Sequence, residues 1–378
     1  MSQQQTIYLD NNATTRLDQR VLDAMLPYYT DYYANASSSH LAGLAVNEAV
    51  EHATWQTACL IGAKQGEIIF TSGATESINL AIKGLLHQKR KHIVTVATEH
   101  KAVLDTCQYM ETAGFEVTSL KLHNNGILDL EVLHETVTDK TLLVIIMMSN
   151  NETGTLQSIA EIASIAHAKG ALFMCDATQA VGKLPIDVKT LGIDLLPLSA
   201  HKFYGPKGIG ALYLSGAAKI KLAPQLHGGG QQRKLRSGTL NVPGIIGLGK
   251  ACEIAMAEME TDQKRITTLR DRLENELLKF EGSFVNGSTI SRIYNTTNIC
   301  FPGVNSENLI LALKNIAVSN GSACSSVTTE PSYVLKALGL SDADALSSVR
   351  FSLGRFTTSE EIEDTITKVS ALAVQLRS

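Results

Sequence analysis

Short apolar runs alternate with longer amphipathic stretches through the first two thirds of the chain. Between most of the runs lie helix-like stretches such as TESINLAIKGLLHQ (75–88) and IAEIASIAHAKG (159–170). Continuously apolar strands that alternate with helices are typical of a mostly parallel sheet covered on both faces. The pattern therefore predicts an α/β fold. The runs with the length of strands are EIIF (67–70), HIVTVA (92–97), LLVIIMM (142–148), ALFMCD (171–176), DLLPLS (194–199) and IGALYL (209–214).

The pattern changes after Pro243. A long amphipathic stretch rich in Glu, Lys, Arg and Leu predicts one helix over about 244–280, and shorter strands and helices follow it. This order of a long helix followed by shorter elements predicts a second, smaller α+β domain. We expect a large domain over 16–255 and a small domain made of 1–15 and 256–378.

Composition and charge narrow the classes of partner. The chain has 378 residues and a formal net charge of −4, and it contains no basic stripe, so nucleic acid is not an expected partner. The longest apolar run, 142–148, is far too short to span a bilayer. The start MSQQQTIYLD has neither a charged beginning nor an apolar core, so it predicts no signal peptide. We expect a cytoplasmic protein that does not bind a membrane.

The six cysteines are scattered without a CxxC pair, which argues against a disulfide framework and against a structural zinc site. One of them differs from the rest. Cys324 lies in SNGSACSSVTTEPSY (319–333), a stretch of small polar residues without apolar periodicity that predicts an exposed, mobile loop. An exposed thiol there suits a nucleophile. The other five, which we interpret as small core residues, are Cys59, Cys107, Cys175, Cys252 and Cys300.

Polar residues stand at the ends of several predicted strands. SGATES (72–77) opens a helix with a glycine and a threonine, TEH (98–100) brings a histidine, DATQ (176–179) an acid, and SAHK (199–202) a lysine. Each has an ordinary explanation as a cap, a satisfied polar group or a solvated turn. In open α/β sheets, however, ligands bind beyond the carboxyl ends of the strands, where these residues converge. A reactive amine, a carboxylate, a stacking ring and a phosphate cradle are what pyridoxal 5'-phosphate (PLP) requires.

Longer motifs carry a specific resemblance. The chain resembles the cysteine desulfurases, in the class V aminotransferase group of fold-type I PLP enzymes. The similarity extends to RFSLGRFTT (350–358), and it implies a large domain with a mostly parallel seven-stranded sheet and a smaller α+β domain that carries the Cys324 loop. The matching motifs are YLDNNATT (8–15), TSGATES (71–77), TEHKAV (98–103), NNETGT (150–155), DATQAVGK (176–183), SAHKFYGPKGIG (199–210), LRSGTLN (235–241) and SNGSACSS (319–326).

The resemblance also implies what the matching residues do. Lys202 is implied to form the Schiff base with PLP and then to move protons, His100 to stack on the ring as an acid–base group, and Cys324 to accept the sulfur. Asp176 is implied to pair with the pyridine nitrogen and Gln179 to touch the phenolic oxygen. The residues implied to hold the phosphate are Thr75, Ser199, His201 and, toward the partner subunit of a homodimer, Thr239. Those implied to bind the substrate carboxylate are Asn151 and Arg350, with Asn35 assisting.

The implied activity is the PLP-dependent removal of sulfur from L-cysteine, which gives L-alanine and a persulfide on Cys324. The sulfur would pass to an acceptor protein such as an iron–sulfur scaffold, or to tRNA-thiolation acceptors. A selenocysteine lyase, a cysteine-sulfinate desulfinase and a transaminase are alternatives within the PLP class, although the Cys324 motif disfavours a transaminase. Two alternatives lie outside that class: a scaffold without catalytic activity and a metal hydrolase. The sequence shows no HxH or HExxH spacing that would support the hydrolase. Such a hydrolase would use His40, His100, His201 and Asp176.

Overall fold

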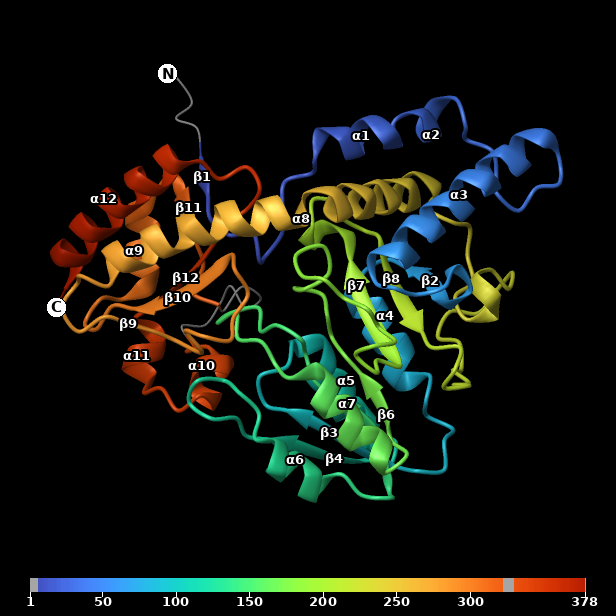
Figure 1. The fold of residues 1–378 in the computed structure, drawn as a ribbon, viewed down its shortest axis with the longest axis horizontal. Helices are drawn as coiled ribbons and strands as arrows, with labels where there is room; N and C mark the ends of the chain where they lie inside the picture. The colour runs from blue at the N-terminus through green and yellow to red at the C-terminus, as the bar shows by residue number, and fades with distance from the viewer. Residues whose placement is uncertain (1–5, 322–329, 378) are drawn as a thin grey trace.

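The centre of the molecule is a seven-stranded sheet in the order β2-β8-β7-β6-β5-β3-β4 (Figure 1). The structure, a computed structural model, describes residues 6–321 and 330–377. Neighbouring strands are parallel except for β8, which runs antiparallel to β7 and to β2. The predicted α/β fold with a mostly parallel sheet is confirmed. The strands are β2 (Ile68–Thr71), β3 (His92–Val96), β4 (Glu116–Leu120), β5 (Thr141–Ile145), β6 (Leu172–Met174), β7 (Leu195–Ser199) and β8 (Gly210–Leu214).

Both faces of this sheet are buried, which explains why its strands are continuously apolar. Alternate residues of a strand point to opposite faces. In β3, Ile93 packs with the buried residues of α4 and α5, whereas Val94 and Val96 pack with those of α1, α3, α7 and the first half of α8. The helices around the sheet are α1 (Gln19–Met25), α2 (Pro27–Thr30), α3 (Leu41–Leu60), α4 (Ala74–Lys83), α5 (Lys101–Thr112), α6 (Leu130–Thr136) and α7 (Ile159–Ala168).

A second hydrophobic core lies at the other end of the molecule (Figure 1). It joins the start of the chain to its last hundred residues, because β1 (Ile7–Tyr8) pairs in parallel with β11 (Ile316–Ala317). Beside this pair stands an antiparallel sheet in the order β12-β10-β9. The remaining elements of this part are β9 (Phe284–Val285), β10 (Thr296–Cys300), β12 (Ser348–Ser352), α9 (Ser306–Leu313), α10 (Tyr333–Ala337), α11 (Asp342–Leu346) and α12 (Ser359–Leu376).

One long helix connects the two parts. α8 (Val242–Leu277) has 36 residues, close to the predicted 244–280. Residues from Val242 to Ala255 contribute to the core of the large sheet, and residues from Ile266 to Leu277 contribute to the second core. The division of the chain into domains at residues 15 and 255 stays a prediction, and this change of core along α8 is what supports it.

The direction of the strands places the site. β3, β5, β6 and β7 are parallel, and β2 runs the same way because both β2 and β7 oppose β8. Their carboxyl ends therefore meet at one edge, where the segments that follow them carry the predicted polar residues. Short 3-10 helices also punctuate this part of the chain: η1 (Gln65–Glu67), η2 (Ala200–Lys202) and η3 (Gln232–Lys234).

Two details differ from the prediction. The helix expected over 75–88 ends at Lys83, with Gly84 as its C-cap, in keeping with the low helix propensity of glycine. Cys59, expected in the core, is exposed, because the buried face of α3 is filled by neighbours such as Thr57 and Ala58. The other four cysteines interpreted as core residues are buried.

Candidate active site

Lys202 ends the turn that follows β7, and the described contacts hold its side chain in place. Its Nζ donates hydrogen bonds to the main-chain oxygens of Asn12 (2.6 Å) and Ala13 (2.8 Å). Two residues later, Tyr204 adopts the left-handed conformation with φ +67°, which is rare for a bulky residue. Its N–H donates to Thr15 Oγ1 (2.8 Å). The first strand-to-helix segment of the chain therefore fixes both the lysine and the turn that presents it.

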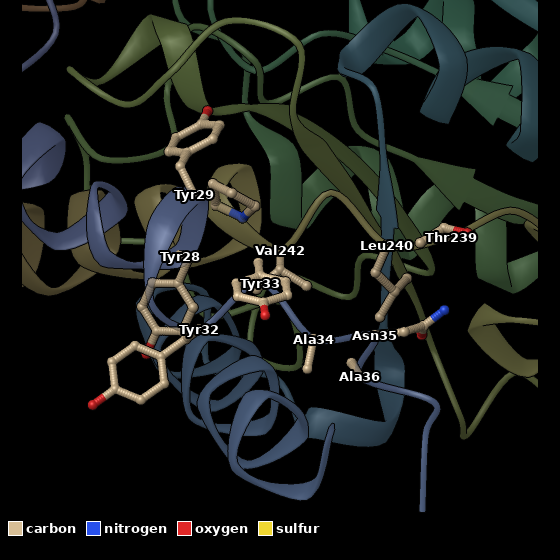
Figure 2. A pocket seen from close by; sticks show the side chains of 11 residues that line it. Tyr28, Tyr29, Tyr32, Tyr33, Ala34, Asn35, Ala36, Thr239, Leu240 and Val242 are labelled. Carbon is tan, nitrogen blue, oxygen red and sulfur yellow. The ribbon is translucent and has the colours of Figure 1, made fainter. Parts of the chain in front are cut away.

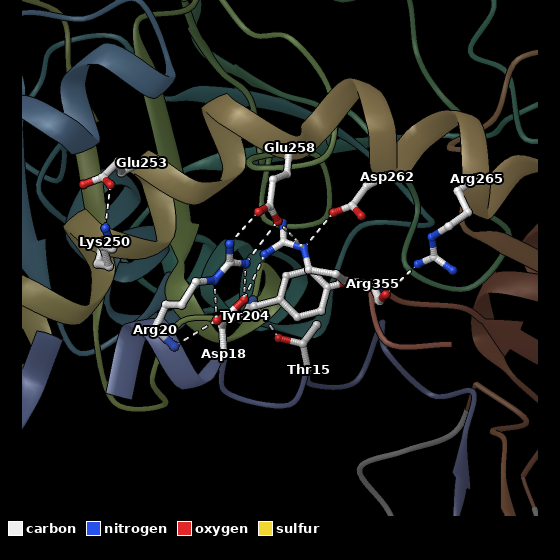
Figure 3. Close-up of polar contacts among 10 residues, drawn as sticks. All are labelled: Thr15, Asp18, Arg20, Tyr204, Lys250, Glu253, Glu258, Asp262, Arg265 and Arg355. Carbon is white, nitrogen blue, oxygen red and sulfur yellow. Dashed lines mark hydrogen bonds and ion pairs between the residues drawn. The ribbon is translucent and has the colours of Figure 1, made fainter. Parts of the chain in front are cut away.

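A charged network secures the same turn from the other side (Figure 3). The Tyr204 hydroxyl accepts a hydrogen bond from the main-chain N–H of Arg355 (2.6 Å), and the Arg355 guanidinium lies 4.4 Å from the centre of the tyrosine ring. The same guanidinium pairs with Asp262 of α8 (2.7 Å) and with Asp18, the N-cap of α1 (3.3 Å). The turn after Lys202 is thus bound to elements from both ends of the chain.

Lys202 and Asp176 both lie close enough to His100 to shift its pKa. His100 caps α5, since its Nδ1 accepts a hydrogen bond from the N–H of Ala102 (3.1 Å). Burial lowers the pKa of His100 and the Lys202 ammonium lowers it further, whereas the Asp176 carboxylate opposes this. Asp176 is buried, and its Oδ1 accepts from the N–H of Thr178 (3.0 Å). The structure therefore brings the predicted amine, ring and acid together.

Gln179 belongs to the same group of side chains. Its Nε2 donates to the main-chain oxygen of Asn12 (2.9 Å), the same atom that accepts from Lys202. Its Oε1 accepts from the Nζ of Lys183 (3.1 Å). Gln179 and Lys202 are thus linked through one shared acceptor.

The start of α4 provides a site for an anion. Gly73 is its N-cap with φ +153°, and no side chain caps the helix there, so its first N–H groups face outward. The Ser199 hydroxyl lies beside Gly73, because a Cβ added to that glycine would stand 3.5 Å from Ser199 Oγ. Thr75 is exposed in the first turn of the helix. These three residues together form a cradle of N–H and hydroxyl donors.

His201 follows Ser199 but is held from another direction. Its Nδ1 contacts the hydroxyl of Thr14 (3.1 Å). Burial lowers the pKa of His201 to about 4, and the ammonium groups of Lys202, Lys207 and Lys183 contribute to this shift. The imidazole is therefore neutral near pH 7 and acts as a hydrogen-bonding group there.

Asn151 and Arg350 meet where the large sheet faces the second core. The guanidinium Nη1 donates to the main-chain oxygen of Asn151 (3.0 Å), and Nη2 pairs with Asp10 (2.6 Å). The Nε–H of Arg350 and the Oδ1 of Asn151 are both buried without a hydrogen-bond partner. Such atoms cost free energy unless a ligand supplies the missing bond.

Asn35 and Thr239 lie apart from these residues, in a pocket of their own (Figure 2). Its lining includes neither Lys202 nor Asp176. Four tyrosines from α2 and the segment after it dominate the wall instead: Tyr28, Tyr29, Tyr32 and Tyr33.

Cys324 lies outside the described residues, so its predicted loop is not placed.

Four residues to which the sequence analysis gave no role lie among the predicted site residues. Lys183, Glu99 and Glu152 are buried titratable groups, and Asn12 supplies the shared acceptor. These residues lie in the motifs DATQAVGK, TEHKAV, NNETGT and YLDNNATT. The motifs alone do not indicate which atoms these residues contact.

Two observations concern metal-binding clusters and membrane spans in the described residues. Within 6–321 and 330–377, no three His, Cys, Asp or Glu side chains come together in a way that could hold a metal ion. His40, which the metal-hydrolase alternative needed, caps α3 through a bond to the N–H of Gly43 (3.1 Å). Among the helices of the same ranges, none is long and apolar enough to cross a membrane.

Comparison with known proteins identifies the family. Residues 7–364 match the family described as Aminotransferase class-V. The chain belongs to this family. It is 51% identical to the cysteine desulfurase IscS of Shewanella sp. (strain ANA-3) over 377 residues, which covers 98% of this chain and 93% of that protein.

Solved structures of this family agree with the fold. A NifS-like protein, 36% identical, superposes with a TM-score of 0.92 over 98% of this chain and 100% of its own. SspA in complex with cysteine, 37% identical, gives a TM-score of 0.83 over 93% of this chain and 100% of its own. The predicted resemblance to the NifS and IscS type of cysteine desulfurase is therefore confirmed.

Class V aminotransferases of this type depend on PLP, and the described residues fit that cofactor. The amine of Lys202 is held by hydrogen bonds, as a Schiff-base lysine requires. The buried carboxylate of Asp176 acts on the same imidazole, His100, as Lys202 does, and it suits a protonated pyridine. The uncapped start of α4 beside Ser199 suits the phosphate group. The other predicted cofactor contacts, from Gln179 and His100, lie in the same place.

Proposed function

We propose that this protein is a cysteine desulfurase that removes sulfur from L-cysteine with PLP bound to Lys202. The observation that carries the proposal is the arrangement of Lys202, His100 and Asp176 at one edge of the sheet, in a chain that is 51% identical to a cysteine desulfurase over its length. When bound, PLP supplies an electron sink for the charge that develops at the substrate α-carbon.

The protein's own residues would position the substrate. We assign the orphaned Nε–H of Arg350 and the side-chain amide of Asn151 to the substrate carboxylate, since both side chains have unused hydrogen-bonding capacity. The Lys202 amine would take the proton from the α-carbon. His100, whose pKa is lowered by burial, is a neutral imidazole near pH 7 that can accept a further proton.

Cys324 would then accept the sulfur. Its thiolate attacks the substrate sulfur, so that a sulfur–sulfur bond forms while the bond between sulfur and the β-carbon breaks, and the β-carbon gains a proton. L-cysteine and one thiol thereby give L-alanine and one persulfide, without an external oxidant or reductant. We propose that the persulfide passes to an acceptor protein that offers a thiol or an iron–sulfur scaffold.

Replacing Cys324 tests the assignment. Cys324→Ala should keep the visible absorbance of the bound cofactor, because Lys202 and its neighbours are untouched, but it should lose at least ~100-fold in cysteine-dependent alanine formation, as expected when the nucleophile is removed. The persulfide, a mass increase of one sulfur atom on the protein, should disappear. Mass spectrometry and an alanine assay measure both quantities.

Cys59→Ala is the matched control, since Cys59 is an exposed thiol on α3, away from the proposed site. It should retain alanine formation and the persulfide. Wild-type rates in Cys324→Ala would overturn the role of Cys324. A wild-type protein that stays colourless after addition of PLP would overturn the whole proposal.

The proposal also covers the oligomeric state of the protein and its cellular compartment. We propose a homodimer in which the tyrosine-lined pocket with Asn35 and Thr239 faces the partner subunit (Figure 2), because large aromatic side chains are exposed around it. We place the protein in the cytoplasm, because a sulfur-accepting thiol must be kept reduced.

A further inference from the structure

Lys183 is a second lysine in the site, and unlike the half-buried Lys202 it is fully buried and unused by the proposed reaction. Its side chain is only 3% exposed, at the end of the turn that carries Asp176 and Gln179. Its Nζ donates to Gln179 Oε1 (3.1 Å). A lysine is almost never fully buried unless a partner requires it there.

The contact with Gln179 has a direction. An ammonium group has three donors and no acceptor, so the amide of Gln179 must turn its oxygen toward Lys183. The amide nitrogen then points the other way, where one of its N–H groups donates to the main-chain oxygen of Asn12 (2.9 Å). The amide has a second N–H that can serve another acceptor. Without Lys183, only the Asn12 oxygen would hold the amide in this orientation, and the amide oxygen would lose its partner.

We propose that Lys183 is a positioning residue that orients the Gln179 amide so that its nitrogen, and not its oxygen, faces the phenolic oxygen of the bound cofactor. The inference rests on the proposed function, because it assigns a partner to a cofactor contact of that site. A donor to the phenolic oxygen lowers the proton affinity of the cofactor, whereas a carbonyl oxygen in the same place would raise it.

The positive charge of Lys183 should also lower the proton affinity of the cofactor. The Lys183 ammonium contributes to the lowered pKa of His201, so its field reaches the other side of the site. Burial, together with the charges of Lys202 and Arg350, lowers the pKa of Lys183 itself to about 7. A positive charge among these groups disfavours the binding of further protons nearby.

The test is a pH titration of the visible absorbance of the holoenzyme. Lys183→Met keeps the length of the side chain but removes both the donor and the charge. It should raise the apparent pKa of the visible band by about one unit, which is a tenfold increase in proton affinity. Lys189→Met is the matched control, because Lys189 is exposed six positions later, and its titration should coincide with that of the wild type.

A second variant keeps the proposal falsifiable if Lys183→Met does not fold. Gln179→Glu retains an oxygen for Lys183 but has no N–H to offer, so it should also raise the apparent pKa. In the Gln179→Glu background, Lys183→Met should raise the apparent pKa of the visible band by less than it does in the wild type, because the two residues act through one contact.

The outcomes separate the two proposals. A yellow Lys183→Met enzyme that titrates like the wild type overturns the role of Lys183 and leaves the proposed function intact. A yellow Gln179→Glu enzyme that titrates like the wild type also overturns it, since the amide nitrogen is then not the donor. A wild type that binds no PLP overturns the proposed function and this inference with it.

Discussion

Glu152 is a carboxyl group that the fold buries between two segments of the second core. Its Oε2 accepts a hydrogen bond from Ser332 Oγ (2.5 Å), and Gly321 packs so closely against the same oxygen that a Cβ would not fit. Burial raises the pKa of Glu152 to about 7, although the Ser332 hydroxyl and the Arg350 charge oppose the shift. The group therefore changes its protonation near neutral pH.

This pKa predicts a pH-dependent stability. The folded state holds the proton more tightly than the unfolded chain, so the stabilisation is complete below the unfolded value of about 4.5 and is lost as the pH rises through about 7. Glu152→Gln has no such proton. Its free energy of unfolding, relative to the wild type, should therefore increase by roughly 3 kcal/mol between pH 4.5 and pH 8.

Urea unfolding at several pH values measures this difference. Glu135→Gln, a change of an exposed carboxyl on α6, serves as the control and should follow the wild type at every pH. If Glu152→Gln also runs parallel to the wild type from pH 4.5 to pH 8, Glu152 does not hold a proton near neutrality.

Single residues of the site divide into those that the sequence reveals and those that it hides. Lys202 and Asp176 were predictable, because each follows an apolar strand and the ends of parallel strands converge. Lys183 and Asn12 were not predictable as partners of Gln179. Asn12 acts through a main-chain oxygen, which any residue has, and it lies 167 positions away from Gln179. Contacts of this kind depend on the fold, and no sequence motif indicates them.

α10 is a short helix with a connecting role. Its N-cap is Ser332, which bonds to Glu152, and its first residue is Tyr333, whose hydroxyl donates to the main-chain oxygen of Glu99 (2.7 Å). Glu99 directly precedes His100. The start of α10 therefore holds two segments that follow strands of the large sheet.

Removing the Tyr333 hydroxyl should weaken this connection. Tyr333→Phe keeps the ring but leaves the oxygen of Glu99, a fully buried residue, without this donor. The expected loss is about 1–2 kcal/mol in the free energy of unfolding, the usual cost of an unsatisfied buried group. Urea denaturation measures it. The control is Tyr109→Phe, because Tyr109 is exposed on α5; equal losses in both variants would contradict the connecting role.

Helices and strands were predictable where burial dominates the sequence. The continuously apolar runs became β2, β3, β5, β6, β7 and β8 of the sheet, since both faces of these strands are covered. β4 was missed, because it has one neighbouring strand and its residues EVTSL are mostly half-buried or exposed. The end of α4 was also missed, because the apolar pattern continues through Leu85 and Leu86 although Gly84 already caps the helix.

Within the described ranges, several exposed apolar side chains gather near the start of α3. Tyr29, Tyr32 and Tyr33 lie on the segment that leads to α3, and Leu41 and Leu44 follow on the first turns of that helix. Tyr33 is 78% exposed and Leu41 85% exposed. Monomeric proteins rarely expose such a set, and aromatic residues are enriched in the centres of interfaces. A second copy of the chain would cover these residues and would also bring Thr239 and Asn35, which lie in the same pocket, toward the partner's cofactor.

The proposed dimer predicts that a charge on this surface separates the subunits. Tyr33→Glu would bury an unpaired carboxylate in the interface, so the dissociation constant should rise by at least ~100-fold, corresponding to roughly 3 kcal/mol. Analytical ultracentrifugation across a range of concentrations measures it. Leu311→Glu on α9 is the control, because Leu311 is 76% exposed on the opposite part of the molecule. If Thr239 contacts the partner's cofactor, the Tyr33→Glu monomer should also bind PLP more weakly than the Leu311→Glu dimer. A Tyr33→Glu protein that remains dimeric would show that the subunits meet elsewhere, and Thr239 would then have no route to the phosphate.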